Sequence, residues 1–259
     1  MLVRLTTAAI QKQGNAPDEY EDAYWPSCPL SAEAWYIRAA VADGATEASF
    51  SREWAGELVE AYGRGRLVES RLAETMPRSQ RRWRAQTERR SLPWYAEEKL
   101  RSGAFSSILG FSAHDHSGGD VAGLNTERGW KAFAVGDTCL ALVRGGRVVS
   151  FFPLGRSEDF SSTPALVSSI GTANGELHRL TRRARGSWRS GDRFLLMTDA
   201  LACWFLRSVE NGRDFSSVLS AATTDGPAVF ESWISERRRS GDIRNDDVTL
   251  MIIDLLANA

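Results

Sequence analysis

The sequence is poor in cysteine, and its three cysteines lie far apart. Cys28, Cys139 and Cys203 form no Cys-x-x-Cys pair among the 259 residues. A disulfide scaffold needs many paired cysteines, and a structural zinc site needs clustered ones, so this pattern argues against both. We therefore expect a reduced, cytoplasmic protein.

Long apolar runs are also missing. No run approaches the roughly 20 residues that span a bilayer, so we expect no membrane partner. Residues 1–15 lack the apolar stretch of a signal peptide. With 42% hydrophobic residues and a formal net charge of -1, the composition is that of an ordinary globular protein. We expect one domain covering residues 1–259, since the chain is long enough to bury one substantial core.

Two motifs of common hydrolases do not occur in the sequence: the nucleotide-binding P-loop and the nucleophile elbow of esterases. The sequence has no Gly-x-x-x-x-Gly-Lys, which argues against a P-loop nucleoside triphosphatase. It has no Gly-x-Ser-x-Gly either, so there is no nucleophile elbow on which a serine triad could be built. The chemistry has to be sought in other side chains.

Short runs rich in branched and aromatic residues predict strands, and two longer segments predict helices. The predicted strands are residues 35–41, 105–111, 130–135, 140–143, 148–152, 194–198 and 248–255. The predicted helices are residues 51–62, with Ser51 as the N-cap, and residues 201–209. Residues 144–147 predict a hairpin turn. Consecutive strands with separate helices favour an α+β fold of antiparallel layers.

Two segments stand apart from this pattern. Residues 64–101 are helical by propensity but interrupted by Pro77 and Pro93, which predicts a lateral helical insert. Its residues 78–101 hold eight basic and three acidic side chains, so a docking surface for a phosphorylated partner and an ordinary solvated face both fit. The slight net acidity of the chain argues against nucleic acid as the partner. Residues 152–169 predict either a flap or an ordinary surface loop.

Acidic residues recur at strand ends or at turns beside strands. They are Glu21, Asp22, Asp43, Asp199, Asp246 and Asp247. Each of them alone would fit a turn or a cap. Clustered carboxylates repel one another and are costly to desolvate, so together they normally need cations. Oxygen ligands suit Mg²⁺ or Mn²⁺ rather than zinc. We predict that Asp43, Asp199 and Asp246 converge on a site for two metal ions.

One histidine pair offers an alternative metal site. His114 and His116 are two residues apart, so on a strand they would face the same way. The Ser-Gly-Gly that follows them favours a hairpin loop, and a histidine pair without a third ligand rarely holds zinc.

Five motifs in a fixed order carry a resemblance to a known family. They are Gln13-Gly14 followed by Glu21-Asp22-Ala23, then Val41-Ala42-Asp43-Gly44, Ala134-Val135-Gly136-Asp137-Thr138, the run 191–199 that ends in Leu196-Met197-Thr198-Asp199, and Arg244-Asn245-Asp246-Asp247-Val248-Thr249. This series resembles the PP2C-like (PPM-type) metal-dependent protein serine/threonine phosphatases of the bacterial single-domain kind. The resemblance implies a four-layer α-β-β-α sandwich of two mainly antiparallel sheets, with the metal site at one edge.

The resemblance also implies roles for the residues of these motifs. Asp43 would bridge two Mn²⁺ or Mg²⁺ ions, and Asp199 and Asp246 would hold the first. At the second ion, the resemblance implies the carbonyl of Gly44 together with Glu21 and Asp22. It places Asp247 beside the first ion and Asp137 at a third ion. The implied reaction is hydrolysis of phosphoserine or phosphothreonine in proteins by a metal-bridged hydroxide. A phosphorylated protein is the implied partner, and a cognate kinase a further one.

The sequence departs from the family pattern around the expected metal site. Ala45 stands where many members have a histidine that protonates the leaving group, and Pro17 and Asp18 stand where an arginine usually grips phosphate. Ala200 replaces a glycine, and Cys203 stands about where many members have an acidic residue. Two alternatives therefore stay open. One is a pseudophosphatase that binds phosphoproteins with a weak or inactive site, and the other is a phosphatase for a small phosphate ester.

Overall fold

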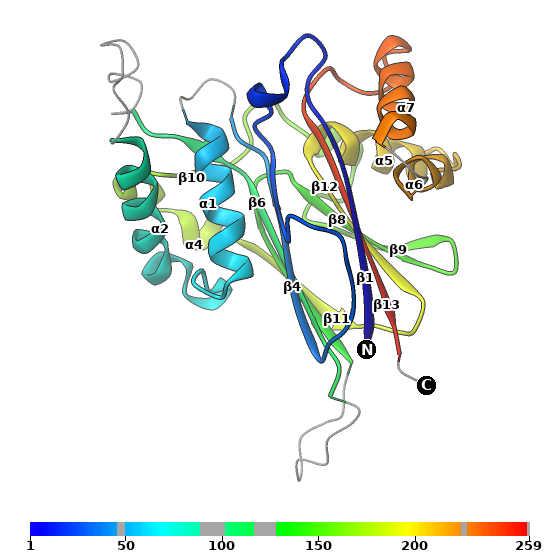
Figure 1. The fold of residues 1–259 in the computed structure, drawn as a ribbon, viewed down its shortest axis with the longest axis horizontal. Helices are drawn as coiled ribbons and strands as arrows, with labels where there is room; N and C mark the ends of the chain where they lie inside the picture. The colour runs from blue at the N-terminus through cyan, green and yellow to red at the C-terminus, as the bar shows by residue number, and fades with distance from the viewer. Residues whose placement is uncertain (46–49, 89–101, 117–127, 224–226, 258–259) are drawn as a thin grey trace.

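Two antiparallel sheets lie face to face between two layers of helices (Figure 1). The computed structural model describes residues 1–45, 50–88, 102–116, 128–223 and 227–257. The α+β class and the α-β-β-α layering predicted from the sequence are confirmed. None of the described helices is both long and apolar enough to cross a membrane.

The first sheet has six strands and joins the two ends of the chain. Its strands, in spatial order, are β3 (Leu30–Glu33), β1 (Leu2–Ile10), β13 (Val248–Leu256), β12 (Asp192–Met197), β8 (Cys139–Arg144) and β9 (Arg147–Phe152). Strand β1 pairs with β13 along its whole length, from Leu2 opposite Leu256 to Ile10 opposite Val248. The predicted hairpin at residues 144–147 joins β8 to β9.

The second sheet has five strands, and a two-stranded ribbon lies apart from it. Its order is β11 (Arg182–Ser187), β7 (Gly129–Val135), β6 (Ile108–His114), β4 (Tyr36–Ala42) and β2 (Ala23–Trp25). The ribbon pairs β5 (Phe105–Ser106) with β10 (Val167–Ser168). The single strand predicted at 105–111 is therefore wrong, since the chain changes partners at Ser107, whose N–H donates to the carbonyl of Asp43.

Helices cover the outer face of each sheet. Helices α1 (Ser51–Gly63), α2 (Leu72–Thr87) and α4 (Leu177–Leu180) lie on the side of the five-stranded sheet, and α5 (Asp199–Glu210), α6 (Ser216–Thr223) and α7 (Pro227–Arg239) cover the six-stranded one (Figure 1). Short 3₁₀ turns occupy Pro17–Glu19, Glu69–Arg71, Ser157–Asp159 and Gly171–Asn174.

Two local predictions about these helices are wrong. Ser51 is the first residue of α1 rather than its N-cap, which is Phe50 at φ 66°, and the Ser51 hydroxyl donates to the carbonyl of Ala45. Pro77 does not interrupt the predicted insert, because α2 continues through it. Trp83 of α2 is buried and packs edge-on against Trp54 of α1, with ring centroids 6.3 Å apart. Pro93 and the rest of 89–101 lie outside the described residues.

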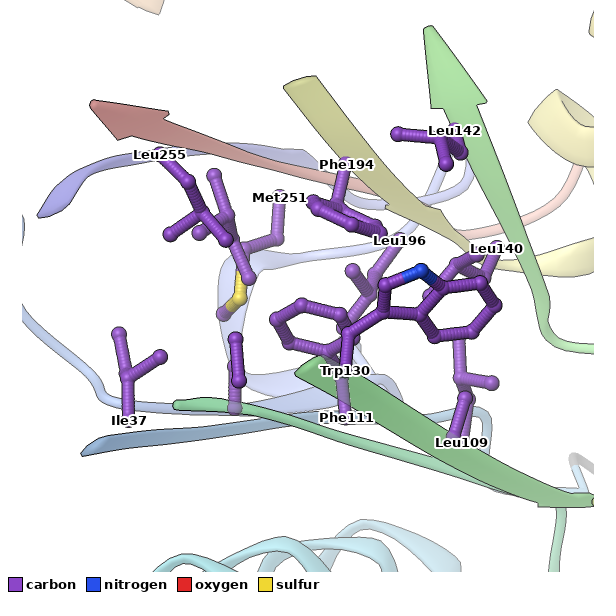
Figure 2. Packing of buried hydrophobic residues seen from close by; sticks show 14 of the residues in the cluster. Ile37, Leu109, Phe111, Trp130, Leu140, Leu142, Phe194, Leu196, Met251 and Leu255 are labelled. Carbon is purple, nitrogen blue, oxygen red and sulfur yellow. The ribbon is translucent and has the colours of Figure 1, made fainter. Parts of the chain in front are cut away.

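The core between the sheets follows the two-residue period of the strands. Along β13, Met251, Ile253 and Leu255 point into this core, while Leu250 and Ile252 point to the helices behind. Phe194 of β12 touches Phe111 across the interface, with centroids 4.6 Å apart (Figure 2). Both faces of the central strands are thus buried, which holds the strand ends in fixed positions at the edge of the sandwich.

Candidate metal centre

The predicted acidic residues come from strand ends at one edge of both sheets. Asp43 directly follows β4, and Asp22 directly precedes the neighbouring β2. In the other sheet, Asp199 follows β12 after one residue, and Asp247 directly precedes the adjacent β13. Because these neighbours are antiparallel, the end of one strand lies beside the start of the next. The segment with Asp137, between β7 and β8, crosses from one sheet to the other at this same edge.

The backbone around Asp43 is held by Ser106, the last residue of β5, and by Ser107, which directly precedes β6. The Asp43 N–H donates to Ser107 Oγ at 3.1 Å, and Ser106 Oγ donates to the Asp43 carbonyl at 2.8 Å. Ser107 Oγ is also 2.5 Å from Thr138 Oγ1. Through the Ser107 hydroxyl, these contacts connect the Asp43 turn to the segment that carries Asp137.

Two positions beside these aspartates need glycine, because other chain segments come too close there for a side chain to fit. A Cβ on Gly44 would lie 2.8 Å from the carbonyl oxygen of Glu21 and 3.0 Å from Ser51. Gly136 has φ +102°, and a Cβ there would lie 2.6 Å from the Cβ of Ser107. The glycines in the predicted Asp-Gly and Gly-Asp motifs therefore let the chain segments at this edge pack closely.

The N-terminal acidic pair is tied to the closing strand. The Asp247 carboxylate accepts the backbone N–H of Lys12 at 2.7 Å and that of Glu21 at 2.6 Å. The buried Asp22 accepts the hydroxyl of Thr249 at 2.7 Å. Asp247 and Thr249, from the last motif, thus position the acidic residues of the first.

Burial and mutual repulsion raise the pKa values of these carboxyl groups. The pKa of Asp43 lies well above its usual range, because the side chain is buried and because Asp22 and Asp199 are negatively charged neighbours. Burial followed by the charge of Asp199 raises the pKa of Asp137 to about 7. Burial is also the main reason why the pKa of Asp22 is well above normal. A bound cation would remove this penalty by stabilising the ionised forms.

Arg244 was not predicted to belong to the site, yet its guanidinium contacts two of the predicted ligands. Arg244 Nη2 donates to Asp199 Oδ2 and lies 2.9 Å from Asp246 Oδ2. Among the described residues, no three His, Cys, Asp or Glu side chains are arranged to hold a metal ion. The ligand roles of Glu21, Asp22, Asp43, Gly44, Asp137, Asp199 and Asp246 thus stay predictions. In the sequence, a role for Arg244 could have been suspected from its position two residues before Asp246.

The donor set nevertheless fits a hard divalent cation. Asp22 Oδ1 and Asp199 Oδ1 are buried, and neither has a hydrogen-bond donor in the described part of the chain. Orphaned buried carboxylate oxygens are costly unless an ion satisfies them. Carboxylate oxygens are also the ligands that Mg²⁺ and Mn²⁺ prefer.

A pocket of about 370 Å³ lies beside Asp199 and Arg244. Its lining comes from the predicted flap, from α5 and from the segment before β13. The lining residues are Ser157, Phe160, Ser161, Ser162, Asp199, Ala200, Cys203, Trp204, Arg207, Gly241, Asp242 and Arg244. Residues 157–162 of the predicted flap therefore lie next to the edge of the sandwich where the carboxylates gather, the acidic edge. The residues of the acidic edge are Glu21, Asp22, Asp43, Asp137, Asp199, Asp246 and Asp247.

The histidine pair lies elsewhere. His114 is the last residue of β6, and Ser107, beside Asp43, directly precedes that strand. A strand rises about 3.3 Å per residue, so His114 is about 20 Å along the strand from the acidic edge. The rings of His114 and His116 contact each other, with centroids 4.9 Å apart. The hairpin loop predicted after them falls at residues 117–127, outside the described residues.

Fold and site together define a class of protein: a four-layer α-β-β-α sandwich with buried carboxylates where its two sheets meet. The family model described as "Protein phosphatase 2C" matches residues 20–226. The chain belongs to the protein phosphatase 2C family, which confirms the resemblance drawn from its motifs. The matched region ends before Asp246, so the closing motif rests on the sequence and the structure.

Solved structures of phosphatases share this fold. The Mycobacterium tuberculosis serine/threonine phosphatase PstP/Ppp is 16% identical with a TM-score of 0.58, covering 99% of this chain and 100% of that one. The catalytic domain of PstP in complex with two manganese ions is 17% identical with a TM-score of 0.56, covering 98% and 100%. The S. agalactiae serine/threonine phosphatase is 12% identical with a TM-score of 0.57, covering 98% and 99%. A search of curated proteins gives no match.

Proposed function

We propose that this chain is a metal-dependent phosphatase that removes phosphate from phosphoserine and phosphothreonine in proteins. The observation that carries the proposal is the gathering of buried carboxylates from both sheets at one edge, in a chain of the protein phosphatase 2C family. Family membership supports a phosphorylated protein as substrate. Such a substrate implies a cognate serine/threonine kinase as a further partner. We propose the cytoplasm as the compartment in which the protein acts.

The site would hold two Mn²⁺ or Mg²⁺ ions, and a third more weakly. Asp43 is the proposed bridge, Asp199 and Asp246 the ligands of the first ion, and Asp137 a ligand of the third. The proposed surroundings of the second ion are Glu21, Asp22 and the carbonyl of Gly44. Bound divalent ions would activate a water molecule as the nucleophile and stabilise negative charge on the phosphoryl oxygens.

The protein's own contribution is to fix these carboxylates before any ion arrives. Thr249 orients Asp22, and Ser106 and Ser107 hold the turn of Asp43. Asp247 accepts two backbone N–H groups from the N-terminal segment, which keeps Glu21 beside the closing strand. Because these supports are backbone and buried hydroxyl groups, the carboxylates lose little freedom on binding a cation.

A direct assay tests the proposal. The protein is treated with EDTA, dialysed and given p-nitrophenyl phosphate or a phosphothreonine peptide with Mn²⁺, Mg²⁺ or EDTA. We expect turnover of both substrates with Mn²⁺ or Mg²⁺ and none in EDTA. Turnover that persists in EDTA would contradict a metal-dependent reaction.

A second candidate function is a pseudophosphatase that binds phosphoproteins without hydrolysing them. The contact of Arg244 with Asp199 and Asp246 favours it, because a cation of the chain already neutralises two proposed ligands. The same assay separates the candidates when phosphopeptide binding is measured beside turnover. A pseudophosphatase binds the phosphopeptide in preference to its unphosphorylated form and releases no phosphate with either metal.

A further inference from the structure

Arg244 lies where its guanidinium forms ion pairs with two carboxylates at once. Asp199 and Asp246 stand at the end of β12 and before the start of β13, and the same nitrogen of Arg244 contacts both. The Asp199 side chain is 11% exposed, whereas that of Arg244 is 55% exposed. The guanidinium therefore reaches the pair from the solvent side and neutralises charge that would otherwise be uncompensated.

The backbone beside Arg244 is anchored, so its side chain can move while Asp246 stays in place. The Asn245 carboxamide accepts the N–H of Gln13 at 2.8 Å and donates to the Gln13 carbonyl at 3.2 Å. The guanidinium of Arg238 donates to the Asp246 carbonyl. Rotation about the bonds of the Arg244 side chain breaks neither of these attachments.

The neighbouring pocket offers the Arg244 side chain a second position. Arg244 lines both the carboxylate pair and the pocket of about 370 Å³, which also contains the serines of residues 157–162. Serine hydroxyls accept hydrogen bonds from a guanidinium, and Asp242 in the same lining, which pairs with Arg237 at 3.5 Å, adds a negative charge. A move of this kind keeps the arginine hydrogen-bonded and partly solvated.

We propose that Arg244 is an internal cation of the metal site. It pairs with Asp199 and Asp246 in the metal-free protein, and a divalent ion displaces it from them into the adjacent pocket. The inference rests on the proposed function, since it takes Asp199 and Asp246 to be metal ligands. It goes further in stating that metal binding competes with an ion pair of the chain itself, so that Arg244 sets the metal concentration at which the site fills.

Calorimetric titration of the whole metal-free chain with Mn²⁺ tests this competition. Arg244→Gln removes both the competing cation and its repulsion of the incoming ion, so we expect binding about three- to tenfold tighter than wild type. Arg244→Lys keeps the charge and should bind close to wild type. The matched control is Arg193→Gln, which removes an equal charge from another Arg–Asp pair, Arg193–Asp254 at 2.6 Å. It should leave the Mn²⁺ affinity unchanged.

Thermal unfolding supplies a readout that does not depend on activity. Because a ligand stabilises the folded state according to its affinity, a given Mn²⁺ concentration should raise the Tm of Arg244→Gln more than that of wild type. Equal Mn²⁺ affinity in wild type and Arg244→Gln overturns the proposal while leaving the metal site standing. Weaker binding by Arg244→Gln also overturns it, since the arginine would then be orienting the carboxylates. Absence of Mn²⁺ binding in every form overturns the proposed metal site itself.

Discussion

Thr249 donates its hydroxyl to the buried carboxylate of Asp22 at 2.7 Å, across a sequence separation of 227 residues. The same hydroxyl oxygen is in contact with the Tyr20 hydroxyl, and the Thr249 N–H donates to Thr198 Oγ1 at 2.9 Å. One threonine thus joins the N-terminal acidic segment, the end of β12 and the start of β13. Its hydroxyl is a structural support of the acidic edge rather than a surface group.

Replacing Thr249 by valine should destabilise the protein. The substitution keeps the shape of the side chain but removes the hydroxyl that contacts the buried Asp22 and the half-buried Tyr20, at a cost of about 1–3 kcal/mol. Urea denaturation in EDTA measures this loss in the free energy of unfolding. Thr249→Ser is the control, because it keeps the hydroxyl. A valine variant as stable as wild type would show that water or another group satisfies Asp22 equally well.

A single methyl group at Gly44 should separate the segments that meet at the acidic edge. The Cβ of an alanine would lie 2.8 Å from the backbone carbonyl of Glu21, which cannot rotate away as a side chain does. We expect Gly44→Ala to lose about 1–3 kcal/mol of unfolding free energy, as overpacking typically does.

Gly56→Ala is the control for Gly44→Ala, because the same substitution there should have the opposite effect on stability. Gly56 lies inside α1, and a Cβ there would meet nothing within 4 Å. Gly56→Ala should therefore stabilise the protein by about 0.5–1 kcal/mol, through helix propensity alone. Destabilisation of both variants to the same extent would mean that the close contact at Gly44 is not the cause.

The runs rich in branched and aromatic residues predicted the central strands because both faces of those strands are buried. Strand β13, for instance, was predicted at 248–255 and extends over Val248–Leu256. Strand β1 was missed although Val3, Thr6, Thr7 and Ile10 are β-branched, because Arg4 and the alanines interrupt its apolar run and the strand is stabilised by pairing with β13. Long-range pairing of this kind cannot be seen in a window of a few residues.

The aspartates of the site could be found because each stands in a short motif beside a strand. Arg244 and Thr249 belong to the closing motif, but the contacts of the arginine and of the threonine hydroxyl were not predicted, for a different reason. Their importance comes from which segments the fold brings together, and the contact of Arg244 with Asp199 spans 45 positions. Charge near a motif is a weak signal until the structure shows where the side chain points.

Asp43→Asn should abolish turnover and leave the metal-free fold as stable as wild type or more so. The amide removes a negative charge from a buried cluster, but it cannot serve as the proposed bridge between ions. Phosphate release at saturating Mn²⁺ and the Tm in EDTA measure the two effects. Asp214→Asn, at an exposed position, is the control for turnover. Wild-type turnover in Asp43→Asn would rule out the bridging role.

The same variant should change how stability depends on pH in EDTA. Burial and neighbouring charges raise the pKa of Asp43 in the folded protein above its unfolded value of about 3.9. The folded state therefore binds the proton more tightly, and stability is lost as pH rises from about 4 towards the folded pKa. Between pH 5 and 7.5, the Tm of wild type should fall more steeply than that of Asp43→Asn. Equal slopes would show that Asp43 stays ionised throughout this range.

Residue 45 is the place to supply the missing general acid. Ala45 directly follows Gly44, its N–H donates to the Phe105 carbonyl at 2.9 Å, and its carbonyl accepts the Ser51 hydroxyl, so the backbone there is fixed. His114 cannot act as the acid from the far end of β6. A general acid contributes about 10²–10⁴-fold, and most when the leaving group is poor.

Ala45→His should therefore raise the rate on a phosphothreonine peptide more than the rate on p-nitrophenyl phosphate. The alkoxide released from phosphothreonine needs the proton, whereas p-nitrophenolate hardly does. Steady-state kcat on both substrates with saturating Mn²⁺ measures the ratio, and Ala45→Gln controls for side-chain size without a titrating group. Equal effects on both substrates would mean that protonation of the leaving group does not limit the rate. If wild type is already fast on the peptide and the histidine changes nothing, Lys12 becomes the residue to mutate, because its backbone N–H contacts Asp247 at the acidic edge.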